Sequence, residues 1–369
     1  MENREYLLLE PASVCTIVTA VATAVFSAQR SYMFDTIAKR NRSLEQGVNT
    51  LESGTAMLVP IFGSITLMVL FFFFSSISFI LTLSVCMSSA FGLGFCLFPL
   101  AERLLGLNAN REIKVPCLGP YPLSIVCLVP IASAVVLCWL YTGHWTLNNV
   151  LGASLCVAVV TFVRFPNMKV AFILLAGLFV YDIFWVFYSA ALFGKNVMVT
   201  VATEAAKNPV ASMAEAFNLH APPGMATELQ LPVKLIFPHD LLGSLSWETP
   251  AGVRGGFMML GLGDIAIPGM FLAYAYRFDF HVPRTGPIKY FPVAVVGYAL
   301  GLIISLTMSL VYRMAQPALL YLVPCVTIPV LALGLYRKEL KTLWSATLTS
   351  PADKDMADGP QQEERDSAV

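Results

Sequence analysis

The stretch Phe257–Tyr276, FMMLGLGDIAIPGMFLAYAY, decides how this chain is interpreted. Its length and apolar character are those of a membrane-spanning helix, yet Asp264 lies near its middle. A second run, Val170–Ala191 (VAFILLAGLFVYDIFWVFYSAA), holds Asp182 in the same unusual setting. We expect the rest of the chain to bring these two carboxyl groups together.

The composition indicates an all-α, polytopic membrane protein. Hydrophobic residues make up 57% of the chain and charged residues 12%, against about 25% charged in a typical soluble domain. The formal net charge of zero gives no basic field for nucleic acid, so no nucleic-acid partner is expected. The eight cysteines lie mostly in apolar runs and the four histidines show no ligand spacing, so we expect no disulfide, no metal and no cofactor.

Hydropathy predicts nine transmembrane helices. The run Ala56–Leu100 is apolar for 45 residues, roughly 68 Å as a helix, and is therefore predicted to form two spans with a tight reversal near Ser75–Ser78. The other predicted spans are Pro11–Gln29, Pro122–Thr142, Asn148–Val163, Val170–Ala191, Gly256–Tyr276, Tyr290–Tyr312 and Pro317–Tyr336. A cleaved signal peptide is the alternative for the first run, but acidic residues dominate its flank where a signal peptide has positive charge.

This pattern divides the chain into three parts. Residues 1–169 are predicted to hold helices one to five, and residues 170–344 helices six to nine together with the long exoplasmic loop 192–255. Residues 345–369 are acidic and are predicted to form a disordered cytosolic tail. Fifteen lysines and arginines fall on one side of the membrane, whereas only Arg4 and Arg313 fall in the short segments on the other. The positive-inside rule therefore predicts an exoplasmic N-terminus and a cytosolic C-terminus.

Asp182 and Asp264 are the only ionisable Asp, Glu, Lys, Arg or His residues in the nine predicted apolar cores. Each costs on the order of 2.5–3.5 kcal/mol at a helix centre, so each is expected to serve a function. Asp182 lies 12 residues from Val170, and Asp264 lies 12 residues from Tyr276. In antiparallel helices both carboxyl groups would lie about 18 Å from the cytosolic edge, at one depth.

Two carboxyl groups that face each other in a low dielectric cannot both ionise, and the pair can share one proton. This is the arrangement of aspartic proteases, in which one carboxylate activates water and the other carboxylic acid protonates the scissile carbonyl. Two intramembrane acids alone favour a proton-coupled transporter over a protease, and polar contacts that hold helices together are a third explanation.

The residues near Asp264 favour an open approach to it. Gly261 and Gly263 leave no side chain before the acid, so another backbone could come close, although small residues also permit ordinary helix packing. Pro268 lacks an N–H, so the carbonyl of Asp264 is expected to lose its usual helical partner. Tyr181 either donates a hydrogen bond from its hydroxyl beside Asp182 or packs as an aromatic ring.

Three motifs carry a resemblance to the signal peptide peptidase family, the presenilin-related GxGD intramembrane aspartyl proteases. Tyr181-Asp182, Gly261-Leu262-Gly263-Asp264 and Gln316-Pro317-Ala318-Leu319 look like the YD, GxGD and PAL motifs, in order, on predicted spans six, seven and nine. The close match covers roughly Val170–Leu320, apart from the centre of the long loop.

The resemblance implies that Asp182 and Asp264 are the catalytic dyad and that Pro317, Ala318 and Leu319 shape the active site beside them. It also implies membrane-spanning peptide substrates with a cytosolic N-terminus, such as remnant signal peptides, and residence in the endoplasmic reticulum. From the residues alone, Pro317 is well placed as the first residue of a helix and Ala318 permits close packing. The sequence leaves open whether the chain forms a homo-oligomer in the bilayer.

The loop 192–255 contains a piece around Lys207–Leu231 that resembles an insertion. Its flanks, Asn196–Val201 and Pro232–Phe237, are predicted to be strands. We expect them to form a short sheet whose edge pairs with an unwound substrate, and an ordinary lid or interfacial hairpin is the alternative.

Overall fold

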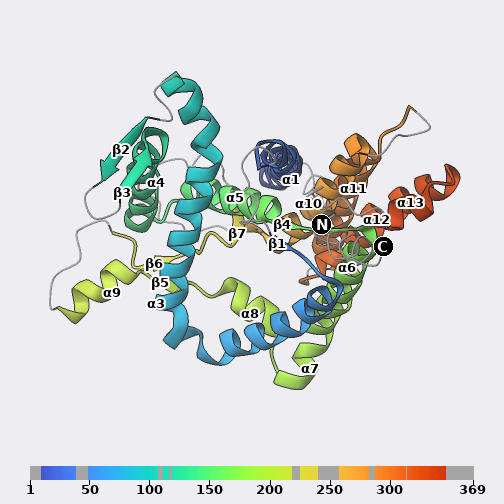
Figure 1. Cartoon of the computed structure of the whole chain (residues 1–369). Coiled ribbons are helices and arrows are strands. Elements are labelled where there is room, and N and C mark those ends of the chain that lie inside the picture. The colour runs from blue at the N-terminus through green and yellow to red at the C-terminus, as the bar shows by residue number, and fades with distance from the viewer. Residues whose placement is uncertain are drawn as a thin grey trace, which may run out of the picture.

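The computed structural model describes residues 10–38, 49–106, 111–115, 119–217, 225–239, 257–281, 287–312 and 314–345. The predicted tail beyond Ser345 therefore lies outside the described residues. Within these ranges the chain is predominantly helical, with only short two-stranded sheets (Figure 1). The prediction of an all-α polytopic membrane protein is confirmed.

The long helices are α1 (Pro11–Ala38), α3 (Ser53–Leu105), α4 (Leu123–Thr142), α5 (Trp145–Phe162), α6 (Met168–Ile183), α10 (Gly263–His281), α11 (Tyr290–Tyr312) and α12 (Ala318–Tyr336). A π-helical turn (Phe184–Tyr188) joins α6 to α7 (Ser189–Phe193), and the remaining helices are α8 (Val197–Thr203), α9 (Pro209–Ala216) and α13 (Leu340–Ser345). The strands pair as β1 (Asn49–Thr50) with β4 (Val163–Arg164), β2 (Glu112–Val115) with β3 (Gly119–Pro122), β5 (Ala206–Lys207) with β6 (Glu228–Leu229), and β7 (Lys234–Pro238) with β8 (Phe257–Gly261).

Seven of the described helices are long and apolar enough to cross a membrane. One of them is α3, whose 53 residues would extend roughly 80 Å, more than twice the thickness of a bilayer core. The predicted tight reversal near Ser75–Ser78 is wrong, because the helix continues and only bends at Phe73, where φ is −122° and ψ is 15° (Figure 1). If α3 is counted twice because it is long enough for two spans, the seven helices give eight membrane-length segments. Helix α10 adds a ninth, which equals the predicted number.

The stretch Phe257–Tyr276 is not a continuous helix. Phe257–Gly261 forms strand β8, and α10 begins only at Gly263. An apolar run of five residues fits a buried strand as well as a helix, and here pairing with β7 decides in favour of the strand. Asp264 consequently lies in the first turn of α10 and not at the middle of a spanning helix.

The predicted sheet in the long loop is half correct. Pro232–Phe237 does contain a strand, β7, but its partner is β8. The other predicted strand, Asn196–Val201, is helical instead, because the Asn196 side chain accepts a hydrogen bond from the Val199 amide at 3.1 Å and caps the start of α8. A local cap here outweighs the β-branched composition.

The core forms where α1, α5 and α10 pack together (Figure 1). Helix α1 contributes a column of alanines without solvent exposure, Ala20, Ala24 and Ala28. A Cβ added to Gly269 of α10 would meet Val160 of α5 at 3.2 Å and Ala24 at 3.9 Å, so small residues allow these helices to approach closely. Helix α1 is therefore part of the core of the fold.

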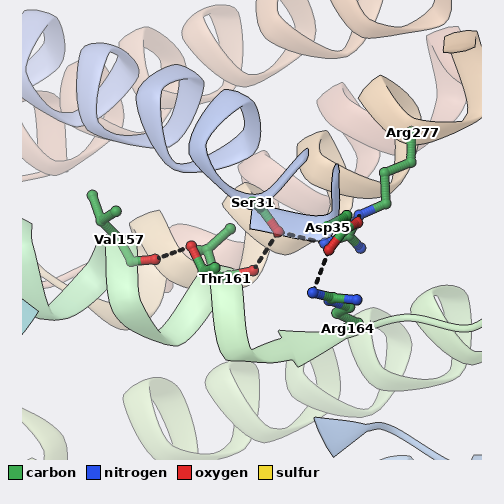
Figure 2. Close-up of polar contacts among 7 residues, drawn as sticks. Ser31, Asp35, Val157, Thr161, Arg164 and Arg277 are labelled. Atoms are coloured by element: carbon green, nitrogen blue, oxygen red, sulfur yellow. Dashed lines mark hydrogen bonds and ion pairs between the residues drawn. The ribbon is translucent and has the colours of Figure 1, made fainter. Parts of the chain in front are cut away.

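A buried ionic cluster joins the same three parts of the chain (Figure 2). Asp35 of α1 pairs with Arg164 of β4 and, at 2.8 Å, with Nε of Arg277 of α10. Ser31 accepts a hydrogen bond from Arg277 and donates one to the carbonyl of Val160 at 3.3 Å. The cluster therefore fixes the end of α10 that lies opposite Asp264.

Helices α11 and α12 pack through a small-residue seam. A Cβ added to Gly297 would lie 2.2 Å from the carbonyl oxygen of Cys325, and one added to Gly301 would lie 3.0 Å from the Cα of Leu322. The spacing of these glycines is the GxxxG pattern that lets two membrane helices approach at the backbone.

We expect Gly297→Ala to destabilise the protein by about 1–3 kcal/mol, because the added methyl group forces α11 and α12 apart. The measurement is the melting temperature of the purified protein in detergent. Gly94→Ala on α3 is the matched control, because nothing lies within 4 Å of the added Cβ there. Equal melting temperatures for both variants would contradict this account of the seam.

Candidate active site

Asp182 lies in the last turn of α6 and is only 2% exposed. The helix begins after Asn167, whose side chain accepts a hydrogen bond from the Val170 amide at 3.0 Å. One carboxyl oxygen of Asp182 accepts a hydrogen bond from the backbone N–H of Leu319 at 2.9 Å. A buried carboxyl group is thus held in one orientation by a segment 137 residues away in the sequence.

That segment is the start of α12. Pro317 is extended (φ −65°, ψ 110°) and forms the N-cap, so the helix begins at Ala318, one residue later than predicted. The N–H of Leu319 belongs to the first turn, where amides have no partner within the helix. Asp182 supplies that partner, and the positive end of the helix dipole favours a carboxylate in this position.

Asp264 enters the site from the strand–helix junction. Leu262, after β8, accepts hydrogen bonds from the amides of Ile265 (3.1 Å) and Ala266 (2.7 Å) and so starts α10. The carbonyl of Asp264 was predicted to lose its helical partner because of Pro268, and the hydroxyl of the fully buried Tyr298 donates to it at 3.1 Å. Tyr298 was not predicted from the sequence, although a tyrosine near the middle of a membrane-length segment was a usable signal.

The two glycines of the motif leave the approach to Asp264 open. Gly261 and Gly263 are both exposed, whereas Asp264 is half-buried. A Cβ on Gly261 would lie 3.5 Å from a carboxyl oxygen of Asp264, and one on Gly263 would reach only the side chain of Ile267, at 3.9 Å. Any larger side chain at position 261 would lie directly against the carboxyl group.

The structure brings Asp182 and Asp264 together. Helices α6, α10 and α12 pack against one another, which places the two acids on neighbouring helices. Of the predicted site residues, Leu319 contacts Asp182 through its amide, and Gly261 lies against Asp264. Pro317 and Ala318 act through the backbone by setting where α12 begins.

The sequence left two roles open for Tyr181, a hydrogen-bond donor and a packed aromatic ring, and the structure favours the packed ring. Its ring lies against Gly63 of α3, where an added Cβ would be 3.5 Å away, and its centroid is 6.4 Å from that of Trp185. The indole N–H of Trp185 donates to Ser64 at 3.1 Å. Two residues of α3 therefore fix the end of α6 that carries Asp182.

Strand pair β7–β8 lies directly beside the site, and one of its edges is closed. The outward backbone groups of β7 are satisfied by two asparagines of α5, which the sequence analysis did not identify. Asn148 donates to the carbonyl of Lys234 at 2.9 Å, while Asn149 donates to the carbonyl of Ile236 and accepts from its amide, both at 2.8 Å.

The other edge belongs to β8. The amide of Leu262 donates to the carbonyl of Val233 at 3.0 Å, which fixes which residues of β8 face β7. With the register Lys234↔Gly261 and Ile236↔Met259, the backbone groups of Met259 and Gly261 point away from β7. Among the described residues no third strand pairs with this edge, which ends three residues before Asp264.

Within the part of the chain that the structure describes, no group of three or more His, Cys, Asp and Glu side chains could hold a metal ion.

Comparisons with known proteins show which family this chain is similar to. The family described as signal peptide peptidase matches residues 43–350. Two plant proteins named signal peptide peptidase-like 1, from Oryza sativa subsp. japonica and Arabidopsis thaliana, are 40% and 41% identical to this chain, over 94% of it and 96% of their own lengths. The mouse protein named signal peptide peptidase is 30% identical over 91% of the chain and 83% of its own length. The chain therefore belongs to the signal peptide peptidase family, and this membership supports the function of an intramembrane protease.

Proposed function

We propose that this chain is an intramembrane aspartyl protease whose catalytic dyad is Asp182 and Asp264. The observation that carries the proposal is the packing of α6 against α10, the helices that hold Asp182 and Asp264, with the buried Asp182 fixed by the Leu319 amide of α12. The comparisons give no support to the transporter that the isolated acids would also have suited.

The reaction follows from one shared proton. The ionised carboxylate takes a proton from water as the water oxygen attacks the scissile carbonyl carbon, and the protonated partner donates its proton to the carbonyl oxygen. Collapse of the tetrahedral diol returns a proton to the dyad and gives the amide nitrogen its second one. Because the proton belongs to the pair, the roles of acid and base are assigned to the dyad and not to either residue.

A helical substrate must unwind before its amide can be attacked, because the hydrogen bonds of the helix shield each carbonyl. The outward edge of β8 supplies replacement partners at Met259 and Gly261. An extended substrate paired there would run alongside the GxGD segment and reach Asp264 across the exposed faces of Gly261 and Gly263. Substrates with helix-breaking residues near the cleaved bond should therefore be preferred.

We expect Met259→Pro to raise KM for a membrane peptide several-fold, because it removes an outward N–H that would bond the substrate. Proline is tolerated on an open strand edge, so the β7–β8 pair should persist. The measurement is the initial cleavage rate against substrate concentration in detergent. Met259→Ala keeps the N–H and is the control; equal KM values for the two variants would count against edge pairing.

We expect Leu319→Pro to lower kcat by at least tenfold, because it removes the N–H that holds Asp182 while proline remains acceptable in the first turn of a helix. Leu319→Ala keeps the amide but loses the same buried side chain, so it separates the hydrogen bond from packing. Cleavage that is equally impaired in both variants would assign the effect to packing alone.

The decisive experiment uses the purified full-length protein in detergent with a synthetic signal peptide. Mass spectrometry should find cleavage within the apolar segment of the peptide. Proton-linked uptake without cleavage in liposomes would instead indicate a transporter, and binding without cleavage would indicate a scaffold for signal peptides.

Family resemblance and the distribution of basic residues also suggest the setting of this activity. We infer an endoplasmic reticulum protein with a lumenal N-terminus and a cytosolic C-terminus, acting on membrane segments such as remnant signal peptides whose N-terminus is cytosolic. Protease protection of epitope tags at the two ends in sealed microsomes tests the orientation.

A further inference from the structure

A groove outside the active site lies where α12, α13 and the start of α6 meet. It has a volume of about 980 Å³, and its lining includes Phe172, Ile328, Leu331, Ala332, Leu335, Lys341 and Trp344. The four residues from α12 follow the spacing of a single helix face, which makes one wall continuously apolar. In Figure 1 α13 extends from the end of α12 at the side of the molecule away from α3.

The groove is held open by a defined turn. Lys338 has φ +60°, in the left-handed region. Its amide donates a hydrogen bond to the carbonyl of Leu335, and the amide of Glu339 donates one to the carbonyl of Gly334. These features form a Schellman motif at the end of α12. Leu343 of α13 is 1% exposed and packs against Gly334 of α12, where an added Cβ would lie 3.1 Å from the Leu343 side chain. The backbone carbonyl of Leu343 accepts a hydrogen bond from the hydroxyl of Tyr274 at 2.9 Å. The position of α13 is therefore fixed by packing against α10 and α12.

The side chains that line the groove are those typical of the boundary between the hydrocarbon core and the lipid headgroups. Trp344 is partly exposed, and its ring centroid lies 5.8 Å from that of Phe172 across the groove. Tryptophan is typical of the level of the lipid headgroups, and this is the end of α12 at which the apolar sequence stops. Ile328 and Leu335 are 60% and 67% exposed, so the apolar wall faces hydrocarbon and not water.

Positive charge lies at the boundary end of this wall. Lys341 lines the groove and is exposed. Lys169 is also exposed and precedes Phe172 by three residues on α6, so it lies on the same helix face one turn closer to the boundary. One cation thus lines the groove, and a second lies one helical turn from Phe172 in its wall.

We propose that this groove binds one phospholipid with an anionic headgroup, with an acyl chain along the α12 wall and the headgroup between Lys169 and Lys341. Basic pockets between membrane helices at this level suit anionic headgroups, whereas a zwitterionic headgroup gains little from two lysines. The site is separate from the dyad, and the proposal does not depend on the proposed proteolysis.

The test uses quenching of Trp344 fluorescence in vesicles that contain phosphatidylserine or phosphatidylcholine with brominated acyl chains. The full-length protein contains five tryptophans, so the Trp344 signal is the difference between the protein and its Trp344→Phe variant. We expect half-maximal quenching at a several-fold lower mole fraction of brominated phosphatidylserine than of brominated phosphatidylcholine. No peptide substrate is present, so the result stands whether or not the protein is a protease.

Variants at the exposed lysine make the test specific. Lys341→Gln should weaken the binding of phosphatidylserine about fivefold without affecting phosphatidylcholine, and Lys341→Arg should retain it. Arg103→Gln removes one exposed charge at the end of α3, far from the groove, and should change nothing. Equal quenching by the two lipids, or a preference that survives Lys341→Gln, would overturn the proposal.

Discussion

Asp264→Asn and Asp182→Asn are each expected to lower the rate of peptide cleavage by about 10²–10⁴-fold, the range of general acid–base catalysis. Asparagine keeps the shape of the side chain and can still accept the Leu319 amide hydrogen bond at position 182. It cannot exchange the proton that the dyad shares, so the loss reports chemistry and not packing. The measurement is single-turnover cleavage of a synthetic signal peptide, with the melting temperature determined in parallel.

The comparison between the two variants matters more than either loss alone. Groups that act as a unit are strongly non-additive, so the double variant should be little worse than either single variant. Glu102→Gln, on α3, is the control for removing a carboxylate elsewhere. An Asp182→Asn enzyme that is only mildly impaired would show that Asp264 acts without a carboxyl partner, and the dyad would have to be abandoned.

The membrane-length helices could be predicted from the sequence, because a segment that crosses the bilayer must be long and apolar. The predicted bounds Tyr290–Tyr312 are those of α11, and α4 begins one residue after its predicted start. The approach of the two acids could also be predicted, since an intramembrane carboxyl group without a basic partner requires some other polar neighbour.

The errors arose where tertiary contacts decide between local alternatives. Phe257–Gly261 has the composition of either a helix or a strand, and only pairing with β7 selects the strand. The bend at Phe73 stands in place of the predicted reversal, and no glycine or proline marks this position in the sequence. Asn148 and Asn149 could not be recognised as partners of a strand edge before that edge was known to exist.

The second large effect is expected at the ionic cluster. Asp35→Asn should destabilise the protein by about 3–5 kcal/mol, because it leaves Arg277, whose side chain is only 4% exposed, as an uncompensated buried charge. The melting temperature in detergent and resistance to limited proteolysis are the measurements. Glu215→Gln, on the exposed face of α9, is the control and should have no effect.

A rescue experiment distinguishes the lost ion-pair attraction from the cost of leaving Arg277 buried without a partner. Replacing both partners, Asp35→Leu with Arg277→Met, should recover most of the stability, because a buried ion pair and an apolar pair of similar size differ little in net free energy. The side chain of Arg164 is 16% exposed, so water can solvate its charge when Asp35 is replaced. Loss of Asp35 as a partner of Arg164 should therefore not unfold the protein. Arg277 lies 13 residues beyond Asp264 on α10, roughly 20 Å along the helix, so the rescued variant should also cleave at close to the normal rate. A double variant that is stable but inactive would instead show that the cluster positions Asp264 through the length of α10.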